Sequence, residues 1–359
     1  MLLLACSSTP SVRAPQRIGI PPELQGLFAQ WQDSGPARPI YVALRPYERA
    51  RDLEVLLFST GSPVFSGIVL PGRWVPVIEP WSRPIDRSWL SGVRADVAAC
   101  VEDSDGPLAL PLTLDGIVMV YRADWWRAQK LPPPNSLAAL REGVLNLRSR
   151  GRGQESPVQS EVPVEQLFWS LAWSYEGRPT DTLYSFPKVH ALRFIQEFNL
   201  AEEPRAVVDR EEDLLDGEVL VLFTSAHKAS QLLNRVSSRG VELSVAAVPG
   251  QGGKSCCIYN GWCMASPQSG ESAPYEWGRY TSEPFQDHLA RRGWLSVLTK
   301  TGKASMDPVA RAMDLTRFYP APRLGDQGEE IVTGAILDAT QGPMTPEEAL
   351  RRAQARIGR

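Results

Sequence analysis

The side chains that most often carry metal or nucleophilic chemistry are few in this chain and are not grouped. The three histidines, His190, His227 and His288, do not stand in an H-x-x-x-H or Cys/His cluster, so the spacing of a familiar zinc site is missing. The sequence also contains no G-x-x-x-x-G-K-[ST] loop, no G-x-S-x-G turn and no G-x-G-x-x-G loop. We therefore expect no bound metal and no cofactor. The remaining candidates are polar and aromatic residues that could bind a ligand.

Several such residues stand directly after, or between, predicted strands. Phe58 ends the apolar run 53–58, and Ser59 and Thr60 follow it. His227 comes shortly after the run 219–223. Asp115 precedes a glycine at a break between two predicted strands. Strand, helix and strand at the spacing seen in residues 17–58 indicate an α/β layer with a parallel sheet. Ligands of such sheets gather at the carboxyl ends of the strands, so the sequence predicts a pocket there.

Apolar spacing predicts the elements that would position these residues. A helix is expected over 24–31, where apolar residues recur at i, i+3, i+4 and i+7. Thr345, Pro346 and Glu348 form the start signal of a last helix that reaches residue 357. The polar stretch 148–163 is predicted to be a surface loop. Further strands are expected at 40–44, 108–112, 117–121, 219–223, 243–248 and 260–265, and further helices at 137–147 and from 168.

Composition excludes several classes of protein. The 359 residues hold 38 Lys+Arg against 41 Asp+Glu, a formal charge of −3, and no basic stripe of the kind that binds nucleic acid. Hydrophobic residues make up 43% and charged residues 22%, which argues against wholesale disorder. No apolar run approaches the roughly 20 residues of a membrane-spanning helix. The 11 Trp outnumber the 10 Phe and the 9 Tyr, an unusual order.

The amino terminus predicts an exported location. Leu3-Leu4-Ala5-Cys6 resembles a bacterial lipobox, in which the cysteine is lipidated, and residues 1–15 would then include a flexible tether at a membrane surface. An ordinary apolar start is the alternative, since the basic segment of a signal peptide is missing. An exported location permits disulfides. A Cys256–Cys263 or Cys257–Cys263 link is conceivable, and burial as small apolar residues is the other interpretation.

Six stretches of the chain carry a resemblance to one family. They are a "PDV"-like strand at 52–58, a "G-x-L-x-P-L"-like stretch at 72–77, a linker strand and "PPKTWDEL"-like series within 108–140, a "GKAAM"-like start at 216–221, a helix with a "G-x-L-P-V"-like turn at 284–297, and a "G-x-x-S-P-E-E-A"-like end at 342–349. Their order over residues 17–357 resembles that of the extracellular solute-binding proteins of ABC importers, in the branch that includes maltose-binding protein.

The resemblance implies an α/β, two-lobed periplasmic-binding-protein type II fold with a ligand cleft between the lobes. Lobe one would hold residues 16–110 and 262–300, and lobe two would hold residues 116–258 and 305–359. The hinge crossings would be 111–115, 259–261 and 301–304. Closure of such lobes over a ligand is a hinge motion that shifts the population toward the closed form.

The resemblance also implies ligand contacts at individual positions. Asp115 stands where the family often places a carboxylate, and Trp262 resembles an aromatic of sugar binders. His227 replaces a tryptophan that stacks on sugar in the maltose-binding branch. Loop or helix positions near the expected cleft add Phe58, Ser59, Thr60, Trp173, Arg323 and Glu161. The alternatives are a solvated turn for Asp115, a surface position for His227, and core packing for the tryptophans and Phe58.

These features lead to a functional hypothesis. A monomeric lipoprotein, anchored through Cys6 and facing the periplasm or cell exterior, would deliver a sugar or polyol to ABC permease subunits without catalysis. A ligand-sensing lipoprotein of the same fold is one alternative. A glycoside-processing enzyme with paired carboxylates is another. An anionic ligand would need clustered basic residues that the sequence does not reveal.

Overall fold

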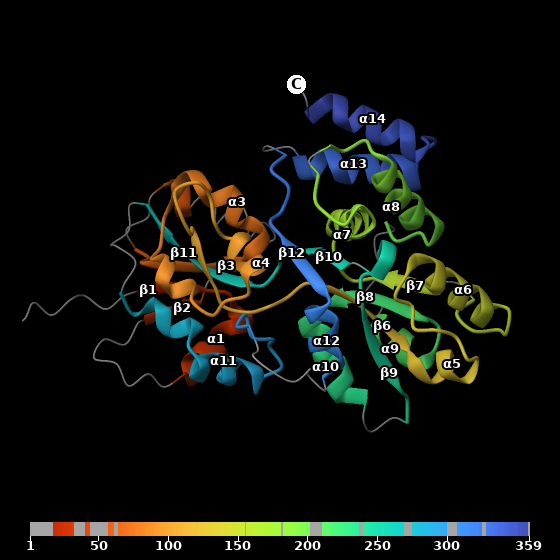
Figure 1. The fold of residues 1–359 in the computed structure, drawn as a ribbon, viewed down its shortest axis with the longest axis horizontal. Coiled ribbons are helices and arrows are strands. Elements are labelled where there is room, and N and C mark those ends of the chain that lie inside the picture. Colours follow the sequence, from red (N-terminus) through yellow and green to blue (C-terminus); the bar gives the residue numbers. More distant parts are fainter. Residues whose placement is uncertain are drawn as a thin grey trace, which may run out of the picture.

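Two α/β lobes stand side by side and are joined by extended segments near the middle of the molecule (Figure 1). The computed structural model describes residues 17–31, 40–43, 57–60, 64–154, 156–180, 182–201, 210–236, 240–253, 255–268, 275–299, 307–324 and 328–357. The predicted lipobox, its tether and the crossing at 301–304 lie outside these residues. No helix in the described ranges has both the length and the apolarity needed to cross a membrane.

A mixed sheet forms the centre of the first lobe, in the order β2-β1-β3-β11-β4, with β5 also paired to β11. Its strands are β1 (Arg17–Ile20), β2 (Ile40–Ala43), β3 (Gly67–Pro71), β4 (Ser82–Arg83), β5 (Ala109–Pro111) and β11 (Trp262–Pro267). The strands β2, β1 and β3 are parallel, which confirms the predicted parallel layer but with β3 as an unpredicted member, whereas β11 runs antiparallel to β3, β4 and β5. The late strand β11 is therefore an inner strand of this sheet.

Short helices surround the first sheet, with α1 and α11 adjacent to each other (Figure 1). The helices are α1 (Pro22–Gln30), α3 (Val75–Ile78), α4 (Ala95–Ala99) and α11 (Glu283–Ala290), and the 3-10 helices are η1 (Gly72–Trp74), η2 (Glu79–Trp81), η3 (Arg87–Leu90) and η5 (Tyr275–Thr281). The predicted helix 24–31 is confirmed as α1. The predicted strand 53–58 is wrong in its described part, because residues 57–59 are helical and the third parallel strand is β3.

The second lobe is built on a four-stranded sheet in the order β7-β8-β6-β9. Its strands are β6 (Ile117–Arg122), β7 (Val158–Ser160), β8 (Val221–Ser225) and β9 (Leu243–Ala247). All six residues of β6 are buried, which accounts for its continuous apolar sequence. β7 falls inside the predicted loop 148–163, so that prediction is wrong over these three residues. Two of them are buried, and β7 pairs with the central strand β8.

Helices cover both faces of the second sheet and extend from it (Figure 1). They are α5 (Ala123–Ala128), α6 (Leu137–Arg148), α7 (Val164–Glu176), α8 (Phe186–Glu197), α9 (Arg210–Asp216), α10 (Ala226–Val236), α12 (Pro308–Asp314), α13 (Gly328–Thr340) and α14 (Pro346–Ile357). The predicted start of α14 is confirmed, since Glu348 N donates to Thr345 Oγ1 at 3.3 Å and Thr345 N donates to Glu348 Oε2 at 3.1 Å.

A third, two-stranded sheet lies between the lobes. β10 (Ser255–Ile258) and β12 (Thr316–Tyr319) are parallel, and β12 crosses the centre of the molecule (Figure 1). Arg94, which precedes α4 of the first lobe, donates to the carbonyl oxygens of Met313 and Thr316, each at 2.9 Å. Phe318 N donates to Asp96 Oδ2 at 3.1 Å. The first lobe is thus hydrogen-bonded to the strand that leads into α13 and α14 of the second lobe.

Candidate functional site

Two short segments join the sheets of the two lobes and lie against each other. Residues 112–116 connect β5 to β6, and residues 259–261 connect β10 to β11. Leu112 N donates to Trp262 O at 2.7 Å, and Asn260 N donates to Asp115 O at 3.2 Å. A Cβ at Gly261 would overlap the carbonyl oxygen of Thr113, so the close approach of the two segments requires glycine there.

Asp115 is buried where the first of these segments enters the second lobe. Its Oδ1 accepts hydrogen bonds from Gly116 N at 2.9 Å and from His227 N at 3.3 Å. Burial raises the pKa of the Asp115 carboxyl from 3.8 to about 7, although these backbone hydrogen bonds and the Arg73 guanidinium act in the opposite direction. The solvated turn considered from the sequence is therefore wrong, and one carboxylate oxygen already serves the start of α10.

Arg73 brings a positive charge from the first lobe to the same place. Its Nη1 donates to Asn260 Oδ1, and its guanidinium lies 4.9 Å from the centre of the Trp74 ring. The preceding Gly72 N donates to Gly261 O at 2.7 Å. A Cβ at Gly72 would meet the Tyr259 ring, so η1 packs directly on the second crossing segment. Arg73, Asn260 and Asp115 thus form one polar cluster at the crossing.

Glu165 of the second lobe interacts electrostatically with Arg73 of this cluster, and Glu161 is another carboxylate of that lobe. Burial raises the pKa of Glu165, in the first turn of α7, with a further increase from the Glu329 carboxylate and an opposing effect of Arg73. The Glu161 carboxylate accepts from Thr224 Oγ1 at 2.9 Å and pairs with Lys228 Nζ at 3.4 Å. The site can therefore donate hydrogen bonds from its guanidinium and accept them at carboxylates, which suits a ligand rich in hydroxyl groups.

His227 lies at the start of α10 and contacts the first lobe. Its ring stacks on Trp294, with ring centres 3.5 Å apart and planes inclined by 7°. Nδ1 lies 3.2 Å from Gly293 O, which only accepts, so Nδ1 carries the proton. Nε2 lies 2.9 Å from the amide nitrogen of Gln231 and accepts from it. Burial lowers the pKa of His227, which agrees with this neutral form of the ring.

The other predicted contact residues differ widely in exposure. Ser59 and Thr60 are exposed, and Trp262 is half-buried, with its backbone N–H donating to Thr113 Oγ1 at 2.9 Å. Arg323 is exposed and pairs with Glu79 of the first lobe at 2.6 Å. Phe58 and Trp173 are 1% and 2% exposed, so their rings pack in the core. Trp173 lies among Trp169 and Tyr319, with ring centres 5.6 and 5.9 Å away.

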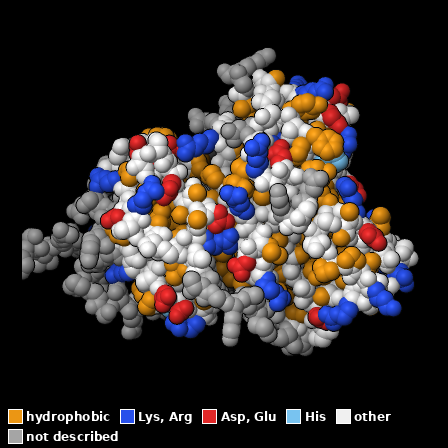
Figure 2. Space-filling view, viewed as in Figure 1, with side chains coloured by type: hydrophobic (Ala, Val, Ile, Leu, Met, Phe, Trp, Pro, Cys, Tyr) orange, Lys and Arg blue, Asp and Glu red, His pale blue; other side chains and the backbone are white. Residues whose placement is uncertain are grey.

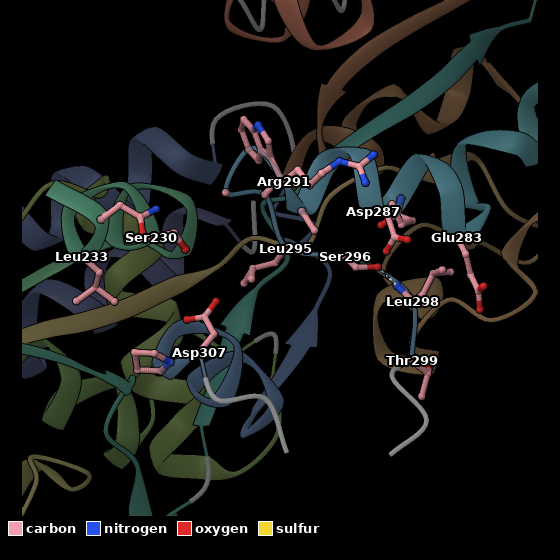
Figure 3. Close-up of a pocket in the computed structure, with 16 residues that line it drawn as sticks. Ser230, Leu233, Glu283, Asp287, Arg291, Leu295, Ser296, Leu298, Thr299 and Asp307 are labelled. Carbon is pink, nitrogen blue, oxygen red and sulfur yellow. Dashed lines mark hydrogen bonds between the residues drawn. The ribbon is translucent and has the colours of Figure 1, made fainter. Parts of the chain in front are cut away.

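A groove of about 720 Å³ opens between the lobes beside the His227–Trp294 contact. In Figure 3, Ser230 and Leu233 stand on one wall, Glu283 and Asp287 stand on the other, and Leu295 and Ser296 lie between them. Trp294 also lines the groove. The walls thus belong to α10 of the second lobe and α11 of the first.

Sequence reasoning missed Arg73, Asn260, Glu165 and Trp294. Only Gly72 and Gly261, each beside one of these residues, hinted at close backbone approaches. No group of three His, Cys, Asp or Glu side chains in the described ranges is placed to hold a metal ion. Figure 2 shows acidic and basic side chains interspersed over the visible face, without a broad region of one sign.

Comparison with solved structures identifies the fold of this chain. No family model and no curated protein matches the sequence. Solved structures match over nearly all of it. The sugar-binding protein MalE of Xanthomonas citri superposes with a TM-score of 0.79 at 15% identity, covering 96% of each chain. The chain has the two-lobed periplasmic binding protein fold.

Other solved structures give the same periplasmic binding protein fold. Maltose-bound MalE3 of T. maritima has a TM-score of 0.71 at 17% identity, with 95% of this chain and 99% of that chain covered. The GacH receptor of Streptomyces glaucescens, solved unliganded and with acarbose, has a TM-score of 0.73 at 15% identity, with 96% and 97% covered. At these identities the likeness establishes the fold.

Proposed function

We propose that this chain is the solute-binding component of an ABC importer, and that it captures a carbohydrate or similar polar solute between its lobes. The observation that carries the proposal is the Arg73–Asn260–Asp115 cluster at the lobe crossing, in a fold whose solved examples include sugar-binding receptors. A guanidinium, an amide and a carboxylate offer both donors and acceptors to hydroxyl groups. Charged hydrogen bonds contribute about 1.5–3 kcal/mol each.

The proposed mechanism is capture by hinge closure. Segments 112–116 and 259–261 connect the lobes and carry Asp115 and Asn260, whereas Arg73 belongs to the first lobe. A ligand held by all three residues therefore contacts groups of both lobes only when they approach. Binding then shifts the population toward the closed form, which a membrane permease would recognise. Asp115, Arg73 and Asn260 would bind the solute centrally, with Trp262, Glu161, Ser59, Thr60 and Arg323 at the periphery.

The proposal extends to the location and the lobe boundaries. Cys6 would carry a lipid that anchors a monomer to the membrane surface on the exported side. Lobe one would comprise residues 16–110 and 262–300, and lobe two residues 116–258 and 305–359, with hinges at 111–115, 259–261 and 301–304. Labelling of the full chain with radioactive palmitate tests the anchor, and Cys6→Ser should abolish the label.

A thermal-shift screen tests the ligand class. A ligand that binds only the native state stabilises it by RT ln(1 + [L]/Kd), about 2.7 kcal/mol at 100 times Kd. At least one sugar, polyol or oligosaccharide should raise the Tm, and Arg73→Ala should remove that shift. If dozens of saccharides leave the Tm unchanged while amino acids or metal chelates raise it, the carbohydrate assignment is wrong.

A further inference from the structure

We propose that the His227–Trp294 stack is a wall that ends the ligand cleft beside Asp115 and restricts the chain to saccharides of one or two rings. This inference rests on the proposed function and specifies the ligand's size. The wall spans both lobes, because His227 starts α10 and Trp294 follows α11. Its two rings are parallel and in contact, so no sugar ring can enter between them.

The wall is held in place from three directions. Leu114 N donates to Leu295 O at 2.9 Å, which fixes the segment that carries Trp294 alongside the first crossing. The His227 ring is bonded to Gly293 O and to Gln231, and its backbone N–H is bonded to Asp115. The stack therefore adjoins Asp115 directly, through the backbone N–H of His227.

The space beyond the wall is already formed. His227, Ser230 and Asn234 share one face of α10, three and four residues apart, and this face lines the interlobe space. Ser230 and Asn234 border the 720 Å³ groove, and Trp294 borders it too. The stack thus separates the polar cluster at the crossing from a groove that has carboxylate, hydroxyl and amide groups. A longer saccharide could occupy that groove only if the stack were removed.

Two aromatic residues that were predicted as ligand contacts offer no ring face to a sugar. Phe58 and Trp173 are buried in the core. A short saccharide can direct its hydroxyls to Arg73, Asn260 and Asp115 at the crossing.

The test measures affinity against ligand length. Isothermal titration calorimetry of the full chain with malto-, cello-, manno- and xylo-oligosaccharides of one to five rings compares the wild type with Trp294→Ala. The wild type should prefer the mono- or disaccharide of its best series over the pentasaccharide by at least about tenfold, equivalent to about 1.4 kcal/mol. Trp294→Ala should reduce that preference to about threefold or less by gaining affinity for the pentasaccharide.

Three further variants make the result specific. His227→Ala removes the other half of the wall and should act like Trp294→Ala, which covers the case that one variant does not fold. Trp294→Phe keeps a ring and should restore the short-ligand preference. Trp125→Ala truncates a half-buried tryptophan of the second lobe that packs on Arg122 and Arg152, away from the crossing, and should keep the wild-type preference.

Two results would overturn the inference. One is a wild type that binds a pentasaccharide as tightly as the disaccharide, and the other is a length preference unchanged in both Trp294→Ala and His227→Ala. Either result leaves the proposed function standing, because a saccharide still binds. A wild type that binds no saccharide of any length contradicts both the inference and the proposed function.

Discussion

The backbone N–H of His227 donates to Oδ1 of Asp115, with nitrogen and oxygen 3.3 Å apart. The acceptor belongs to a segment that joins the lobes, and the donor begins α10 of the second lobe. The Asp115 carboxylate therefore caps α10 although it belongs to a different segment of the chain. The helix dipole favours negative charge at this end of a helix. The same side chain is the one that we propose to contact the ligand.

Asp115 should make stability depend on pH. Its pKa is about 7 in the native state and near 3.8 when exposed. Between these values the native chain binds a proton that the unfolded chain does not, so stability falls as pH rises from about 4 to 7, by up to roughly 4 kcal/mol. Asp115→Asn lacks this titration. The difference in Tm between Asp115→Asn and wild type should increase from pH 4.5 to pH 8. A difference in Tm that stays constant or decreases over this pH range would contradict a raised pKa for Asp115.

Gly261→Ala should destabilise the protein strongly. The new methyl group would overlap Thr113 O and press on the Tyr259 ring, so the two crossing segments would have to separate. Overpacking of this kind costs about 1–3 kcal/mol or more. Gly334→Ala is the matched control, since its Cβ meets nothing within 4 Å in α13, and helix propensity should stabilise it by up to about 1 kcal/mol. Urea unfolding measures both, and equal stabilities would be inconsistent with the close approach.

Arg94→Ala should weaken the attachment of β12 to the first lobe. The change leaves the carbonyl oxygens of Met313 and Thr316 without their guanidinium donor, at a cost of about 1–3 kcal/mol. Arg87→Ala removes an exposed ion pair with Glu102 at 3.5 Å and should cost less than about 1 kcal/mol. Thermal unfolding compares the two, and small-angle scattering reports the lobe arrangement. A larger loss of stability in Arg87→Ala than in Arg94→Ala would contradict the expected role of Arg94 in holding β12 to the first lobe.

The four described cysteines should be unreactive in the native protein. Cys100, Cys256, Cys257 and Cys263 are buried, and burial raises the pKa of Cys257 and of Cys263 to about 12. Because the thiolate is the reactive form, Ellman's reagent at pH 8 should label none of them until guanidinium is added. A Cys6→Ser background removes the remaining thiol. Rapid labelling of the folded variant would show that at least one thiol is accessible.

Much of the fold follows from local sequence patterns. The apolar spacing of α1, the continuous apolar run of β6 and the start signal of α14 each specify their element without help from distant residues. The misplaced strand 53–58 and the missed strand β7 show the limit. Leu57 and Phe58 are apolar enough for a strand but are helical, and β7 is a short segment that pairs with β8.

The candidate site depends on contacts that periodicity does not contain. Asp115 could be predicted because a carboxylate at a break between strands is visible in the sequence. Arg73 reaches Asn260 across 187 positions, and His227 reaches Gly293 across 66. Neither separation corresponds to the repeat of a helix or a strand. The partner of each residue depends on how the two lobes pack together. Arg73 and Trp294 therefore became candidates only in three dimensions.

The position of β11 has a consequence for biosynthesis. A nascent chain that has emerged as far as residue 250 already contains every strand of the second sheet, whereas the first sheet still lacks the inner strand that pairs with β3, β4 and β5. The sheet whose sequence begins later can therefore be completed earlier on the ribosome. The order of strands in the sequence thus permits the second sheet to form first, the opposite of the amino-terminal-first order that is general for cotranslational folding.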